Sequence, residues 1–219
     1  MNGTRIALVG LVAGCALAAW PKREVVVDTH RVARQLVIWR TLAQLDDPVV
    51  ILGDSIVEAS TLPRSLCGHA IVNAGIGGAS TASQLGAFLS ESLGKKRAAL
   101  VVVSLGANDA AIPHSVEQYS SNYRALLTEL AALTPRSAIA AIPPPEAGLE
   151  ETKKVSAALI DSYNALLPQL AKEARALFIP LPGMPVRHTL DGIHLNAAGY
   201  EVWDKAMLQG IEAALCKST

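Results

Sequence analysis

Residues 48–55 read Pro-Val-Val-Ile-Leu-Gly-Asp-Ser, a short β-branched run that stops at a glycine followed by two polar residues. A continuous apolar run of this length predicts a strand that is buried on both faces, which is the type that parallel sheets use. Similar runs follow at residues 70–73, 98–104, 137–142 and 176–179. The sequence therefore predicts a sheet of five strands.

Helical segments alternate with these strands. Apolar residues three or four positions apart predict helices at 32–45, 81–93, 116–133, 150–174 and, after Asn196 as a cap, up to about residue 215. In the first helix the apolar positions are Val32, Leu36, Trp39, Leu42 and Ala43, and in the fourth Pro168 is expected to kink or break the helix. The alternation predicts an α/β fold whose parallel sheet is covered on both faces, with functional residues at the carboxyl ends of the strands.

The composition excludes several classes of protein. The chain has 219 residues, of which 51% are hydrophobic and 17% charged, so it is not a disordered chain. Lys plus Arg and Asp plus Glu both number 19, and this zero net charge argues against a general nucleic-acid binder. Three cysteines are too few for a disulfide scaffold or a four-cysteine zinc site. The length suits one domain, which we place at residues 28–216.

Residues 1–20 are predicted to be a signal peptide or a membrane or lipid anchor. Ile6–Trp20 is an uncharged run of fifteen residues, shorter than a spanning helix usually needs. Val12-Ala13-Gly14-Cys15 resembles the bacterial lipobox, in which Cys15 would be acylated, and Ala16-Leu17-Ala18 resembles an ordinary cleavage site. We therefore expect an exported protein, periplasmic or membrane-anchored. The alternative is a cytosolic protein with an apolar N-terminal helix.

The remaining two cysteines form an even pair. Cys67 and Cys216 could form a disulfide bond in an oxidising compartment, and two buried free thiols are the alternative.

Candidate catalytic residues follow the predicted strands. Ser55 stands between a strand and a helix, where unpaired backbone N–H groups can hold a developing oxyanion. Asp191 precedes His194 by three residues, a spacing that lets the carboxylate bond the imidazole and prepare it as a base for the serine. The Asn108 amide and the Gly78 backbone N–H are further candidate oxyanion donors. Asp54, the neighbour of Ser55, and Gly77, the neighbour of Gly78, are included as supporting residues. His188 is the alternative candidate for the base.

Four segments together resemble a known family. They are residues 51–56, 73–78, 106–109 and 191–195, which match in order the four signature blocks of the SGNH hydrolases, also called GDSL esterases and lipases. Many relatives have Asp where this chain has Ala79 and Gly where it has Ala107. The resemblance implies a three-layer α/β/α sandwich with a flavodoxin-like sheet of order 2-1-3-4-5.

The same resemblance implies the roles of the site residues. Ser55 would be the nucleophile, His194 the base and Asp191 the acid of a serine esterase. The oxyanion donors would be the backbone N–H groups of Ser55 and Gly78 and the side chain of Asn108, with Gly77 as the near alternative to Gly78. No metal or cofactor is expected.

The expected partner is a small ester: a short-chain acyl ester, an acetylated glycan or a lysolipid. Nucleic acid is not expected as a partner. Five apolar loop residues could line a modest pocket for the ester: Leu62, Leu66, Ile112, Leu149 and Met184. One alternative is a metal-dependent phosphohydrolase, in which Asp54, Asp109 and Asp191 bind Mg²⁺. The other is a catalytically idle, envelope-anchored binding protein.

Overall fold

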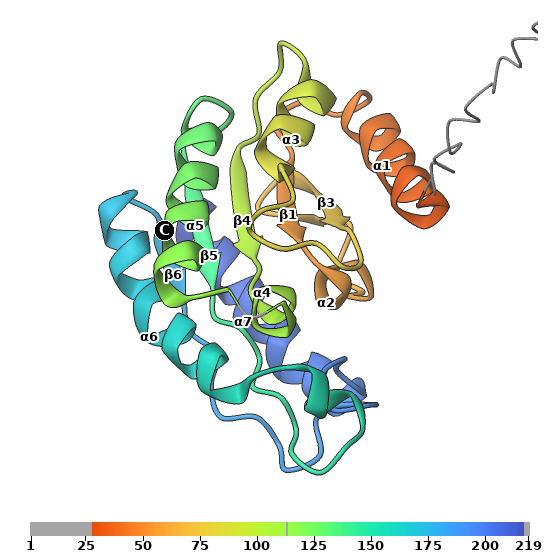
Figure 1. Cartoon of the computed structure of the whole chain (residues 1–219). Helices are drawn as coiled ribbons and strands as arrows, with labels where there is room; N and C mark the ends of the chain where they lie inside the picture. Colours follow the sequence, from red (N-terminus) through yellow and green to blue (C-terminus); the bar gives the residue numbers. More distant parts are fainter. Residues whose placement is uncertain (1–27, 113, 217–219) are drawn as a thin grey trace, which may run out of the picture.

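Six strands form one sheet in the order β2-β3-β1-β4-β5-β6 (Figure 1). The computed structural model describes residues 28–112 and 114–216. All neighbouring strands pair in parallel except β2, which pairs antiparallel with β3 at the edge. The strands are β1 (Val49–Gly53), β2 (Ser65–Leu66), β3 (His69–Gly75), β4 (Leu100–Ser104), β5 (Ser137–Ala140) and β6 (Leu177–Ile179). The predicted order of the five parallel strands is confirmed, and the two-residue β2 is an addition.

Helices cover both faces of the sheet. They are α1 (Thr29–Leu42), α2 (Ser55–Glu58), α3 (Leu85–Leu93), α4 (Ala107–Ala111), α5 (Val116–Ala131), the 3-10 helix η1 (Glu151–Lys154), α6 (Ala157–Glu173) and α7 (Ala197–Leu215). The helices α3, α5 and α6 pack side by side in one layer, while α7 packs against β4, β5 and β6 from the other side (Figure 1). The predicted three-layer α/β/α sandwich is confirmed.

The strand register brings the candidate residues to one edge of the sheet. Gly53, at the end of β1, is level with Gly75 of β3 and with Ser104 of β4. The three strands therefore end at the same level, and the residues that follow them lie at the same edge of the sheet. Gly75 has to be a glycine, because a Cβ there would collide with the backbone of Glu58 in α2. This close approach holds α2 directly over the end of β3.

Two predicted helices differ from the observed ones. The segment 150–174 is split, because the Ser156 side chain caps α6 by accepting a hydrogen bond from the Leu159 N–H, so that α6 begins only at Ala157. Pro168 stays inside α6, where it was expected to interrupt the helix. The segment 81–93 becomes helical only at Leu85, because Ser80 and Ser83 first form a hydrogen-bonded turn.

The first helix is confirmed, although most of its apolar residues do not face the sheet. Of the five that defined the pattern, Leu42 is buried, whereas Val32, Leu36 and Trp39 are exposed. The inward side carries Arg34, which donates hydrogen bonds to the carbonyl oxygens of Asn73 and Gly75 and to the Asn73 side chain. Arg34 thus holds α1 to β3 together with the fully buried Ile38 and Leu42, and Val32, Leu36 and Trp39 are left outside.

Predictions for residues 1–20, including Cys15, concern a segment outside the described residues. Within residues 28–112 and 114–216, no helix combines the length and the apolar character needed to cross a bilayer.

Candidate active site

Ser55 is the first residue of α2 and follows the buried strand β1 by two positions. Asp54 precedes it as the helix cap, and its Oδ1 accepts a hydrogen bond from the Ile56 N–H at 2.9 Å. The cap directs the start of α2, and with it the Ser55 side chain, toward the carboxyl edge of the sheet. Ser55 itself is half-buried.

Ser55, His194 and Asp191 form a continuous chain of hydrogen bonds. The Ser55 Oγ lies 3.0 Å from the His194 Nε2, and the His194 Nδ1 lies 2.6 Å from the Asp191 Oδ2. The other Asp191 oxygen accepts hydrogen bonds from the backbone N–H groups of Ile193 and His194. This arrangement fixes the ring, leaving Nε2 to receive a proton from the serine.

The two carboxyl groups beside the site have opposite pKa shifts. Burial raises the pKa of Asp191, but the hydrogen bonds from His194 and Ile193 outweigh it and lower that pKa to about 2. Asp191 is therefore ionised at neutral pH and can stabilise a protonated His194. Asp54 is buried away from water, and this burial raises its pKa to about 7.

Gly78 lies in the loop after β3, and Asn108 lies in α4, which follows β4. Gly78 has a φ of 75°, a backbone conformation that favours glycine. Asn108, in α4, donates from Nδ2 to the Ala79 carbonyl oxygen at 2.9 Å, which joins α4 to the 76–79 loop. Each Asn side chain has two N–H donors, so a second remains for a ligand.

A hydrogen bond to Glu58 shows which of the two glycines, Gly77 or Gly78, has a backbone N–H available to an oxyanion. The Gly77 N–H donates to the Glu58 Oε2 at 2.6 Å, whereas within the described residues the Gly78 N–H has no hydrogen-bond acceptor. His30 and Arg34 of α1 contact the same carboxylate, at 3.1 and 3.6 Å. Sequence reasoning missed Glu58, although its position three residues after Ser55 on the same helix was a usable signal.

Asp109 is fully buried and stabilises the loop after Gly78 through hydrogen bonds. It accepts hydrogen bonds from the backbone N–H and the hydroxyl of Thr81, and it contacts His114 Nδ1 at 3.1 Å. The magnesium alternative requires three carboxylates to meet, but each of them binds a separate partner. The three carboxylates are Asp54, Asp109 and Asp191. Among the described residues, no three His, Cys, Asp or Glu side chains are placed to hold a metal ion.

His188 does not reach Ser55. Its Nδ1 lies 2.8 Å from the Pro185 carbonyl oxygen and its Nε2 lies 2.9 Å from the Pro144 carbonyl oxygen, so both ring nitrogens are occupied. Its backbone N–H also donates to Glu146, which holds the segment leading to Asp191. His188 therefore positions a loop, and the alternative base is not supported.

The five apolar loop residues do not form one pocket. Leu66 lies in β2 at one edge of the sheet, whereas Met184 lines a cavity with Leu181 and Phe178 beside β6 at the other edge. Six strands of a sheet span about 25 Å, which is too wide for a shared small pocket. The prediction of a common lining was wrong because it assumed that loops at one edge must converge.

The comparisons with known proteins agree with this geometry. The sequence model of the GDSL-like Lipase/Acylhydrolase family matches residues 51–202, a range that contains Ser55, Gly78, Asn108, Asp191 and His194. The comparison with curated proteins finds no significant match.

Solved structures share the fold. A protein from Streptococcus pneumonia is 24% identical with a TM-score of 0.69, covering 82% of this chain and 92% of that chain. A GDSL-like lipase from Bacteroides thetaiotaomicron is 22% identical with a TM-score of 0.65, covering 84% and 99%. An acetylxylan esterase from Geobacillus stearothermophilus is 20% identical with a TM-score of 0.58, covering 75% and 94%.

The family match extends over most of the chain, from β1 into α7. The candidate residues come from four separate segments within it and meet at one edge of the sheet. The chain belongs to the GDSL-like lipase/acylhydrolase family, the SGNH hydrolases, and is an ester-bond hydrolase.

Proposed function

We propose that this protein is a serine esterase that cleaves small carboxylic esters, acyl or acetyl, through an acyl-enzyme on Ser55. The observation that carries the proposal is the hydrogen-bond chain from Ser55 through His194 to Asp191, at 3.0 and 2.6 Å. The first distance lies within the range at which a base can take a proton from a nucleophile, and the second is a hydrogen bond by which the carboxylate orients that base.

The first half of the reaction forms the acyl-enzyme. Ser55 Oγ attacks the ester carbonyl carbon while His194 Nε2 takes the hydroxyl proton, and Asp191 stabilises the resulting imidazolium. The negative charge that develops on the carbonyl oxygen is held by the backbone N–H groups of Ser55 and Gly78 and by the Asn108 amide. The carbon–oxygen bond to the alcohol then breaks, and His194 returns the proton to that alcohol.

The second half releases the acid. Water attacks the acyl carbon while His194 takes a proton from that water. The backbone N–H groups of Ser55 and Gly78 and the Asn108 amide again hold the oxyanion. The bond to Ser55 Oγ breaks, the serine recovers its proton, and the free carboxylic acid leaves. Every proton moves between Ser55, His194, the substrate and water, so these steps are balanced without a cofactor.

The substrate class and the location are parts of the same proposal. An acetylated glycan is one candidate, because one of the similar structures is an acetylxylan esterase. Short acyl esters and lysolipids are the others. The uncharged run Ile6–Trp20 supports an exported protein, periplasmic or membrane-anchored, with residues 28–216 as its hydrolase domain.

The experiment that tests the proposal measures hydrolysis of p-nitrophenyl esters from acetate to palmitate by the full chain, beside Ser55→Ala and Ser162→Ala. Ser162 is an exposed serine on α6 and is the matched control. We expect Ser55→Ala to lower turnover by at least about 10³-fold and Ser162→Ala to leave it unchanged. Near-normal turnover by a folded Ser55→Ala protein overturns the assignment.

A second arm separates the proposal from metal chemistry and from an idle site. EDTA is expected to leave the rate unchanged, and Asn108→Ala is expected to lower kcat by about 10²–10³-fold with the fold intact. Loss of activity in EDTA that Mg²⁺ restores would support the phosphohydrolase alternative. A folded wild-type protein that is inactive on all these esters and on acetylated xylan would support an idle site.

A further inference from the structure

The outward side of α1 is unusually apolar for a surface helix. Leu36 is 60% exposed, Val37 55%, Val32 53% and Trp39 45%. In the described part of the chain, these are four of the eight large hydrophobic residues that are exposed. A contiguous apolar patch of this kind marks a surface that contacts another phase or partner.

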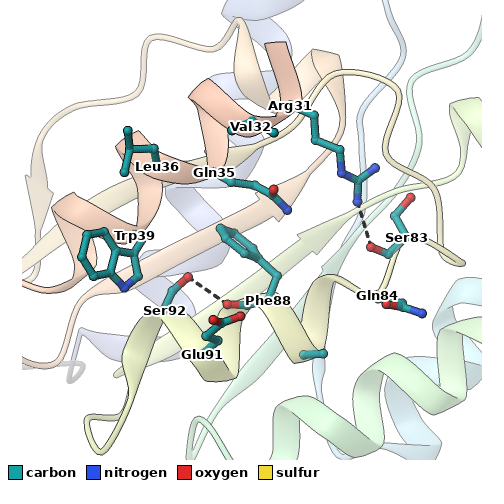
Figure 2. Close-up of a pocket in the computed structure, with 11 residues that line it drawn as sticks. Arg31, Val32, Gln35, Leu36, Trp39, Ser83, Gln84, Phe88, Glu91 and Ser92 are labelled. Atoms are coloured by element: carbon teal, nitrogen blue, oxygen red, sulfur yellow. Dashed lines mark hydrogen bonds between the residues drawn. The ribbon is translucent and has the colours of Figure 1, made fainter. Parts of the chain in front are cut away.

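A groove adjoins this surface toward α3, and its lining mixes apolar side chains with polar ones, among them Gln35, Arg31 and Glu91. It has a volume of about 520 Å³, and its lining includes Val32, Leu36 and Trp39 from α1 and Phe88 from α3. Figure 2 shows the three α1 side chains in a row along the helix, with Phe88 of α3 directed toward α1. The groove lies beside β3, away from the edge formed by β6.

The charges on α1 are of one sign. The helix carries Arg31, Arg34 and Arg40 and has no Asp or Glu. Arg34 faces inward onto Glu58 and Arg31 donates to the Ser83 carbonyl oxygen, so Arg40 is the exposed arginine among the three. The segment before the helix carries two basic and two acidic residues, namely Lys22, Arg23, Glu24 and Asp28. A helix that combines exposed Leu, Val and Trp with basic residues is typical of one that lies in the interface of an anionic bilayer.

The chain before α1 limits where the helix can lie. The uncharged run Ile6–Trp20 is followed by eight residues, 21–28, before Thr29 begins the helix. Eight residues extend to at most about 30 Å. If the run is retained in a membrane, the first turn of α1 cannot be farther from it than this.

We propose that the outward face of α1, formed by Val32, Leu36, Val37 and Trp39, is a docking surface that lies on an anionic lipid bilayer. The apolar side chains enter the boundary between headgroups and acyl chains, and Arg40 meets the lipid phosphates. A second copy of this chain is a rival occupant, but the uncharged run Ile6–Trp20, eight residues before α1, favours a bilayer.

Docking would set the active site at a defined place relative to the bilayer. The first turn of α1 contacts elements beside the site, since His30 contacts Glu58 of α2 and Arg31 donates to the Ser83 carbonyl oxygen at 3.0 Å. The carboxyl edge of the sheet, where Ser55 lies, is therefore the end of the domain nearest to the point where residues 1–27 join.

The experiment uses tryptophan quenching by brominated lipid. The chain has three Trp residues, and Trp203 is fully buried, so a full-length Trp20→Phe variant reports contact between Trp39 and lipid. It is incorporated in vesicles of phosphatidylglycerol and phosphatidylethanolamine with brominated acyl chains. We expect the Trp39 emission to be lost, and the added change Trp39→Phe to remove the quenchable signal.

Variants of the apolar face complete the test. In the Trp20→Phe background, Leu36→Glu with Val37→Glu is expected to restore Trp39 emission while hydrolysis of a soluble p-nitrophenyl ester stays unchanged. Leu177→Glu, an exposed leucine on the opposite edge strand β6, is the matched control and is expected to keep the quenching.

Three results would overturn the proposal. One is unquenched Trp39 emission in vesicle-bound protein. The second is quenching that survives Leu36→Glu with Val37→Glu. The third is a dimer in detergent that the same two changes dissociate, which would assign the face to a second copy. Because quenching does not depend on turnover, failure here is separate from failure of the esterase proposal.

Discussion

At the scale of single residues, Glu58 is the link between α1 and the oxyanion loop. Its carboxylate accepts the Gly77 N–H while it contacts His30 and Arg34, so it holds the loop that presents the Gly78 N–H. It touches no reacting atom in the proposed mechanism, and we regard it as a positioning residue.

We predict that Glu58→Ala lowers kcat roughly tenfold with little change in KM, because a displaced Gly78 donor weakens stabilisation of the oxyanion more than binding of the ester. Glu58→Gln keeps an acceptor for Gly77 and is expected to recover most of the rate. Steady-state kinetics on a p-nitrophenyl ester measures both, with Glu91→Ala on the exposed side of α3 as the control. An unchanged kcat in Glu58→Ala would refute the positioning role.

Asp54 makes stability depend on pH. Burial raises its pKa from 3.8 to about 7, so between these values the folded protein holds a proton that the unfolded chain has released. As the pH rises from 5 to 7, this contribution to stability is lost at roughly 1.4 kcal/mol per pH unit, or about 2 kcal/mol in all.

Asp54→Asn should remove this dependence, since Asn also caps helices but does not titrate. Urea unfolding at pH 5 and pH 7 measures the change, and we expect the variant to lose less stability than the wild type over that interval. Asp161→Asn, on the exposed side of α6, should behave as the wild type does. Equal pH dependence in Asp54→Asn and the wild type would contradict the argument.

The contact between Asp191 and His194 is local and could be anticipated from spacing, whereas the contact between Ser55 and His194 joins residues 139 positions apart and follows from the fold. Asp191 and His194 are three residues apart, and Ser55 stands at the end of a strand that is apolar throughout. Glu58 was missed because its contact with Gly77 depends on the direction in which α2 leaves β1. The bonds of His188 to Pro144 and Pro185 depend on two loops whose paths no local pattern encodes.

At the scale of elements, the strands were easier to predict than the helix boundaries. Buried β-branched runs have few alternatives, whereas β2 is only two residues long and has no pattern of its own. The segment 150–174 looked like one helix because the capping signal of Ser156 lies inside an otherwise helical pattern. The orientation of α1 could not be predicted, because the inward face combines the buried Ile38 and Leu42 with Arg34, which reaches two carbonyl groups at the end of β3.

Asn196 joins two elements, and its loss should destabilise both. Its Oδ1 caps α7 by accepting the Gly199 N–H at 3.1 Å, while its Nδ2 donates to the Thr189 carbonyl oxygen in the segment before Asp191. We predict that Asn196→Ala lowers the free energy of unfolding by about 1–2 kcal/mol, measured by urea denaturation. Asn196→Asp keeps the cap and should recover most of that loss, whereas an unchanged stability in Asn196→Ala would show that the cap is not needed.

At the scale of the whole molecule, one covalent bond joins distant parts of the chain. Cys67, next to β2, and Cys216, at the end of α7, form a disulfide bond across a sequence separation of 149 residues, with their Cα atoms 5.4 Å apart. The sequence alone favoured two buried free thiols at least as much as a disulfide bond, because pairing depends on where α7 ends relative to the β2 edge.

We predict that replacing both cysteines with serine lowers the free energy of unfolding by about 2–5 kcal/mol. Urea unfolding with and without dithiothreitol provides the control, because the reductant should destabilise the wild type to a similar extent and leave the double variant unaffected. A wild type whose unfolding is insensitive to the reductant, under conditions that reduce all thiols, would argue against the bond.

The position of this bond also orders the events of biosynthesis. A chain is made from its amino end, so Cys216 emerges only after the segments with Ser55, Asp191 and His194 have been made. Until then the only other cysteine available to Cys67 is Cys15. Acylation of Cys15, or its removal with a cleaved leader, would eliminate that competitor, so that the native partner is the only thiol left when translation is complete.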